Sequence, residues 1–198
     1  MGNRVVRGVV GCFTVFFLLA WYMAAGHAAN WNIDALMTEL SQTEPGRARF
    51  VEKKTIRMLE EPVVSSGELL YLPPDRLERK TLKPREETMV VDGGVATIVR
   101  GNRTHTMQLQ EFPELAGVID SIRGTLAGNR QLLEKSFELK LEGPRQSWRL
   151  LLKPTDKGLA RIIRVIRMEG AYGRVHSIEL EQMDGDSSVM TIAPLPKK

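Results

Sequence analysis

The chain has 198 residues, of which 42% are hydrophobic and 26% charged, and its formal net charge is +4. This length suffices for a single domain with a substantial core. Basic and acidic residues are interleaved, as in Arg76-Leu77-Glu78-Arg79-Lys80, whereas a nucleic-acid-binding surface concentrates its positive charge. We therefore expect no nucleic-acid partner.

The N-terminal segment has the three parts of a secretory signal peptide. Two arginines precede an apolar run over residues 9–25, and Gly26-His27-Ala28 follows as a small-x-small cleavage site. We predict that residues 1–28 are removed and that 29–198 form the mature protein. A transmembrane anchor is the alternative, because the run approaches the roughly 20 residues that span a bilayer. A lipobox over residues 9–12 is less favoured, because it precedes most of the apolar run.

The sequence has one cysteine, Cys12, which lies in the predicted signal peptide. The mature chain would then lack a disulfide, a thiolate nucleophile and a cysteine metal site. Its net charge would fall from +4 to +2, because the removed segment holds two arginines and no acidic residue. Folding would rest on the core alone.

The mature chain begins with a predicted helix. Apolar residues at positions 33, 36, 37 and 40 share one helical face, Asn32 can cap the helix, and Pro45-Gly46 ends it. A strand is predicted from Arg47 to about Leu59. Glu52 and Lys54 share the parity of Phe50, so either a bulge turns them outward or they form a polar pair at the rim of a cavity.

Residues 65–94 predict three strands in a row. Pro73-Pro74-Asp75 ends the first, Pro84 follows the second and Asp92-Gly93-Gly94 ends the third. Proline cannot donate to a β-ladder, and Asp-Gly between apolar runs is a strong hairpin signal. A further hairpin is predicted over residues 95–109, turning at Gly101-Asn102.

The hydrophobic period then changes. Pro113 can open a helix whose apolar residues recur with helical spacing up to Leu126, and Gly128 can end it. A short helix is predicted over residues 130–135. Strands resume from Phe137 to Ile192, which brings the expected total to about eleven. Their short links favour antiparallel pairing, and such a sheet must curl or split to bury its apolar face.

Motifs for catalysis or metal binding are missing from the sequence. It contains no HExxH, nucleophile elbow, glycine-rich phosphate loop or Cys/His cluster. Asp184 and Asp186 offer too few oxygens for calcium, which takes six to eight. We therefore predict a protein that is not an enzyme, with no catalytic residue, no metal and no cofactor.

Several ordered stretches resemble one protein family. Phe50-Val51-Glu52-Lys53, Ser66-Gly67-Glu68-Leu69, the proline turn at Pro74-Asp75 and Val90-Val91-Asp92-Gly93 resemble the LolA-like periplasmic lipoprotein carriers. Residues 74–79, 123–128 and 184–190 resemble the LolA-related branch found beside aryl-polyene and fatty-acid-like synthesis functions. One position departs from the family pattern, because Pro73 stands where these carriers have an arginine.

The resemblance implies a mainly β fold, namely an incomplete, half-open antiparallel β-barrel of about 11 strands with a helical lid over an apolar cavity. It implies a single carrier domain over 29–198. The expected function is a periplasmic carrier, or chaperone, that binds the acyl chains of a lipoprotein or lipid-like cargo and transfers it toward the outer membrane. An inner-membrane donor, an outer-membrane acceptor and a monomeric state are expected.

Residues expected to line the cavity are apolar and lie on the predicted sheet or lid: Phe50, Met58, Leu69, Tyr71, Leu77, Met89, Val91, Ile98, Leu115, Val118, Ile119, Ile122 and Leu126. The alternative function is a lipid-sensing or lipid-binding module of an envelope regulatory system, because regulators of that kind have a similar fold.

Overall fold

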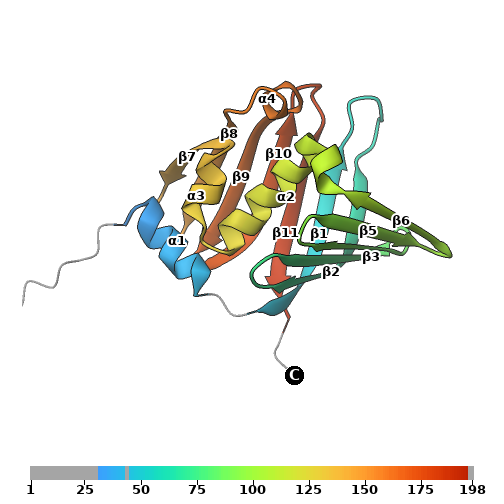
Figure 1. Cartoon of the computed structure of the whole chain (residues 1–198), viewed down its shortest axis with the longest axis horizontal. Coiled ribbons are helices and arrows are strands. Elements are labelled where there is room, and N and C mark those ends of the chain that lie inside the picture. The colour runs from blue at the N-terminus through green and yellow to red at the C-terminus, as the bar shows by residue number, and fades with distance from the viewer. Residues whose placement is uncertain (1–30, 43–44, 196–198) are drawn as a thin grey trace, which may run out of the picture.

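A computed structural model describes residues 31–42 and 45–195. Within these ranges eleven antiparallel strands form one sheet in the order β6-β5-β4-β3-β2-β1-β11-β10-β9-β8-β7 (Figure 1). The strands are β1 (Gly46–Thr55), β2 (Val63–Leu72), β3 (Arg76–Lys83), β4 (Glu87–Asp92), β5 (Val95–Arg100), β6 (Arg103–Gln108), β7 (Phe137–Glu142), β8 (Trp148–Pro154), β9 (Ile163–Ala171), β10 (Arg174–Gln182) and β11 (Ser187–Pro194). The sheet is not closed into a barrel, since β6 and β7 stand at opposite ends of this order. The mainly β, half-open fold expected from the sequence is confirmed.

Helices lie on one face of the curved sheet, which we call the inner face (Figure 1). They are α1 (Ile33–Ser41), α2 (Pro113–Leu126), α3 (Arg130–Glu134) and α4 (Leu159–Ile162), with a 3-10 turn η1 (Leu109–Glu111) before α2. Asn32 caps α1 as predicted, because its side-chain oxygen accepts a hydrogen bond from the amide of Ala35 at 3.0 Å. Gly128 follows α2 with a φ of +63°, the left-handed conformation that favours glycine.

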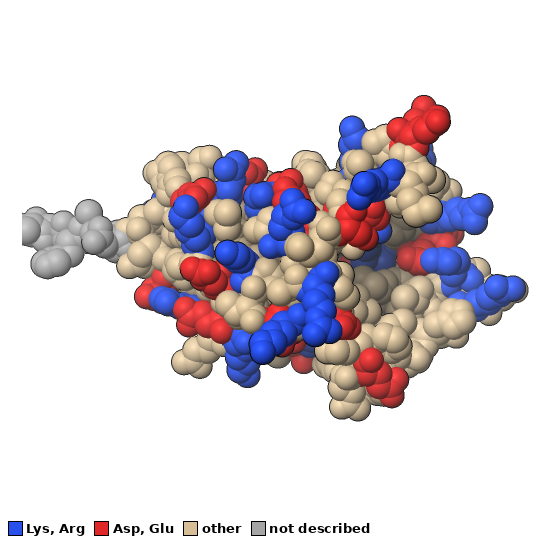
Figure 2. Space-filling model, turned by 90° about the horizontal axis from the view of Figure 1, so that it is seen from above, with Lys and Arg blue, Asp and Glu red and all other residues tan. Residues whose placement is uncertain are grey.

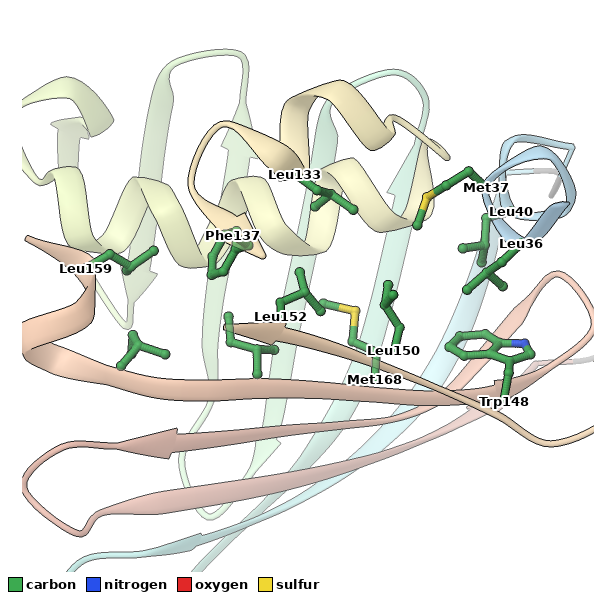
Figure 3. Packing of buried hydrophobic residues seen from close by; sticks show 12 residues of the cluster. Leu36, Met37, Leu40, Leu133, Phe137, Trp148, Leu150, Leu152, Leu159 and Met168 are labelled. Carbon is green, nitrogen blue, oxygen red and sulfur yellow. The ribbon is translucent and has the colours of Figure 1, made fainter. Parts of the chain in front are cut away.

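The large core cluster fills the space between α1, α3 and strands β7–β9. Figure 3 shows Trp148, Leu150, Leu152 and Met168 directed from the sheet toward the helices. Alternation along β8 explains this arrangement, because every second residue of a strand faces the same side. Trp148 is the largest fully buried side chain in the described part of the chain.

A second, smaller cluster lies under α2 on the other half of the sheet. It consists of Val91, Ala96, Leu109 and Ile119, with Leu77, Met107 and Ala116 packed around it. Helix α2 therefore touches both clusters, since Val118 and Ile122 pack against the large one. Ile119 is the buried residue that α2 contributes to this small cluster in the described part of the chain.

Four local expectations are wrong. Strand β1 ends at Thr55 and not near Leu59. The 3-10 turn η1 includes Leu109, which was expected to end a strand, and α4 was not among the predicted helices. The bulge expected in β1 is absent, because residues 48–55 pair with β11 without a register shift. Glu52 consequently stays on the inner face with Phe50, where its ion-pair partner is Arg79 and not the Lys54 of the predicted polar pair.

The predicted signal peptide lies outside the described residues. Among residues 31–42 and 45–195, no helix combines the length and the apolar character needed to cross a membrane.

Candidate functional site

The inner face has two parts that differ in how well helices cover them. The β7–β10 part is filled by the large cluster. On the β1–β6 part, the strand register aligns apolar residues in rows across the sheet, and one row contains Leu69, Met89 and Ile98. These three side chains are only half-buried. They belong to neither of the two core clusters.

Residues predicted from the sequence to line a cavity fall into four groups. The half-buried sheet group is Leu69, Tyr71, Leu77, Met89 and Ile98, and the fully buried group is Phe50, Val91 and Ile119. On α2, Val118 and Ile122 pack against the large cluster, Leu126 is half-buried and Leu115 is exposed. Met58 stands apart in the β1–β2 loop, where 93% of it is exposed, because β1 ends before it. The structure therefore does not bring Met58 to the inner face.

A polar cluster of Glu52, Ser65 and Arg79 interrupts the apolar rows. Nη2 of Arg79 lies 2.6 Å from a carboxylate oxygen of Glu52 and 3.2 Å from the hydroxyl oxygen of Ser65. The guanidinium carbon stands 4.7 Å from the centroid of the Phe50 ring, a cation–π distance. The side chains of Arg79 and Glu52 are 28% and 16% exposed, so the ion pair is largely removed from water.

Gly67 makes the local backbone of this cluster possible. It lies opposite Phe50 on β1 and opposite Thr81 on β3, next to a register shift between β2 and β3. A Cβ atom at this position would come within 1.9 Å of the Lys80 carbonyl oxygen, so only glycine permits this approach. The two strands can then come close beside the polar cluster.

Arg123 ties α2 to the turns at the edge of the small cluster. Its Nη1 donates a hydrogen bond to the Gly93 carbonyl oxygen at 2.9 Å, and its Nη2 lies 3.3 Å from a carboxylate oxygen of Asp75. Asp120, one turn earlier on α2, lies 3.6 Å away. Burial raises the pKa of the Asp120 carboxyl, and the nearby Arg123 charge opposes that rise. Arg123 thus links the helix to the β2–β3 and β4–β5 turns.

We expect Asp75→Asn to loosen α2 without unfolding the protein. The Asp75 carboxylate is 46% exposed, so solvent limits the pair to about 1 kcal/mol or less. The opening of α2 should then become more frequent by up to about fivefold. Hydrogen exchange of the α2 amides measures this change.

Asp92→Asn is the matched control for Asp75→Asn. Asp92 on β4 pairs with Arg76 on β3 at 2.6 Å, at the same end of the sheet. Equal acceleration of α2 exchange in both variants would contradict the role given to the Asp75–Arg123 contact.

The surface is hollowed beside the β1–β2 loop, between that loop and the part covered by helices (Figure 2). Lys/Arg and Asp/Glu side chains stand at the margin of the hollow, and other residues cover its wall. Ion pairs such as Glu87 with Arg100 lie on neighbouring strands at this end of the sheet. The described residues contain no group of three metal-ligating side chains that could hold an ion.

The family assignment follows from a match that covers most of the chain. Residues 25–194 match the model of the family described as outer membrane lipoprotein carrier protein LolA-like. The chain belongs to the LolA-like family. A comparison with curated protein sequences finds no significant match.

Solved structures resemble the LolA-like chain at low sequence identity. A LolA superfamily protein from Nitrosomonas europaea is 10% identical over 85% of this chain and 95% of that one, with a TM-score of 0.48. The MucA/MucB complex of Pseudomonas aeruginosa is 14% identical over 81% of this chain and 54% of that one, with a TM-score of 0.48. The lipoprotein LppX of Mycobacterium tuberculosis is 9% identical over 83% of this chain and 97% of that one, with a TM-score of 0.40.

Sequence reasoning missed the role of three charged residues. Arg79 shares its parity on β3 with Leu77, and Glu52 shares its parity on β1 with Phe50, so both lie on the inner face in the structure. Their pairing depends on strand register, which periodicity does not give. Helical spacing separates Arg123 from the apolar face of α2, yet its side chain is only 10% exposed.

Proposed function

We propose that this LolA-like protein is a periplasmic carrier that binds the acyl chain of a lipoprotein or lipid-like cargo and transfers it toward the outer membrane. One observation carries the proposal: α2 spans the inner face, and a small apolar cluster together with the contacts of Arg123 holds it to the β1–β6 part. The family match to lipoprotein carriers supports the same conclusion.

Acyl binding is energetically reasonable for such a surface. Removing a chain of about 16 carbons from water is worth on the order of 10 kcal/mol, at about 0.8 kcal/mol per buried CH₂. This gain can offset the separation of Ile119 from Val91 and Ala96, because a single buried aliphatic side chain contributes about 1.5–3 kcal/mol. We propose that the chain lies between α2 and the row of Leu69, Met89 and Ile98.

We propose the cargo class from the resemblance in sequence motifs. Residues 74–79, 123–128 and 184–190 support a member of the branch associated with aryl-polyene synthesis, whose cargo would be a polyene or fatty-acid-like lipid. A donor at the inner membrane and an acceptor at the outer membrane complete the proposed route, with the carrier acting as a monomer after removal of residues 1–28.

Native mass spectrometry of the protein purified from the periplasm tests the carrier function. We expect a second mass series that exceeds the protein mass by one lipid or acylated molecule, and we expect organic extraction to remove it. The delipidated protein should then take up a fluorescent acyl probe. Absence of both bound lipid and probe uptake would contradict the proposal.

A further inference from the structure

The guanidinium of Arg79 uses few of its hydrogen-bond donors. Arginine offers five N–H donors, and the hydrogen bonds of Arg79 within residues 31–42 and 45–195 all run through Nη2. Nε is buried and has no hydrogen-bond partner. A buried donor without a partner costs about 1–3 kcal/mol, so the site favours an additional oxygen acceptor.

Apolar residues surround this cation on the surface proposed to hold the acyl chain. Arg79 stands directly opposite Leu69 on β2 and Met89 on β4, and Ile98 continues the row. Close cross-strand pairs have side chains within contact reach. A molecule that lies along this row therefore contacts the Arg79 guanidinium and an apolar surface at the same time.

The charges on this part of the inner face favour an anion. By strand register, the charged residues that share the inner face of this part leave two positive charges in excess: Glu52, Lys54, Arg79, Glu87, Arg100 and Arg103. Lys54 and Arg103 have no ion pair in the described part of the chain. A negatively charged acceptor group lowers this local excess.

From this geometry we propose that Arg79 binds the carboxylate of the cargo, so that the ligand is an amphiphile with an acyl chain and a free carboxyl group. The inference rests on the carrier function proposed above and specifies the chemical class of its ligand. Carboxylate fits because arginine presents planar, paired donors that match its two oxygens. Glu52 holds the guanidinium in place and competes with the ligand for it.

The experiment compares a fluorescent fatty acid with its methyl ester on the delipidated protein. The two probes share one chain and differ only in the carboxylate, so the ratio of their dissociation constants isolates the head-group contact. We expect the acid to bind about tenfold more tightly than the ester, since a charge-assisted hydrogen bond is worth at least that ratio. Arg79→Met should bring the ratio of the two dissociation constants close to one.

Two further variants keep the result independent of folding defects. Glu52→Gln removes the competing carboxylate and should tighten acid binding several-fold, a gain that a misfolded protein cannot produce. Arg49→Met removes an exposed arginine on the opposite face of β1 and should change neither probe.

The two proposals fail in different ways. Equal binding of acid and ester by the unaltered protein, or a preference that survives Arg79→Met, would overturn the carboxylate site and leave the carrier function standing. Failure of both probes to bind would overturn the carrier function and the carboxylate site with it.

Discussion

Ile98→Asp should lower the affinity for a neutral acyl ester probe by more than about 100-fold while the protein stays folded. The new carboxylate would stand on the apolar row beside Met89, where an acyl chain must displace its water. Removing water from an unpaired charge costs several kcal/mol. Arg79 lies two strands away, at about 4.8 Å per strand, and is already paired with Glu52. Fluorescence titration of the delipidated variant measures the loss.

Val99→Asp is the matched control, because it makes an equal change one residue along β5. Val99 points to the outer face and is exposed, so its carboxylate stays in water. Both variants carry the low strand propensity of aspartate, which cancels in the comparison. A comparable loss of probe affinity in both variants would contradict acyl binding on the inner face.

Trp148→Ala should lower the free energy of unfolding by about 3–5 kcal/mol. Its ring is 1% exposed within the large cluster and lies against Gly170, where an added Cβ would come within 2.3 Å of the ring. The indole N–H also donates a hydrogen bond to the Tyr172 carbonyl oxygen at 2.6 Å. Truncation leaves both a cavity and an unpaired carbonyl. Urea denaturation followed by circular dichroism measures the loss.

Trp31→Ala compares the same residue type at the margin of the large cluster. Trp31 is only half-buried, and its indole donates to the Gly143 carbonyl oxygen at 3.1 Å. We expect a cost of about 1–2 kcal/mol, a value typical of partly exposed positions. If Trp31→Ala cost as much as Trp148→Ala, the large cluster would not be the main source of stability.

Turn residues made the ends of several strands predictable. Proline at positions 73, 74 and 84 and the Asp-Gly pair at 92–93 act locally, and the structure has strand ends at each of them. The helix beginning at Pro113 was predictable for the same reason, since its period and caps lie within one short stretch. Helix α4 was not predictable because its four residues are too few to show a period.

Contacts between strands set the details of the candidate site, and these are not local. Arg79 meets Glu52 across 27 residues, and Arg123 meets Gly93 across 30. Strand parity indicates which face a residue occupies, whereas register decides its partner. Strand parity in the sequence therefore indicates which residues share a face, whereas the partners of the charged groups on that face come from the register in the structure.

Photo-crosslinking with a diazirine-bearing fatty acyl ester tests the position of the cargo most directly. We predict that the modified peptides come from β3–β5 and α2, around Met89 and Ile98. The competing location is a groove of about 580 Å³ beside the β7–β8 turn, lined by Trp148, Arg149, Glu169 and His176 among others. Labelling confined to that groove or to the outer face would contradict a carrier that holds its acyl chain under α2.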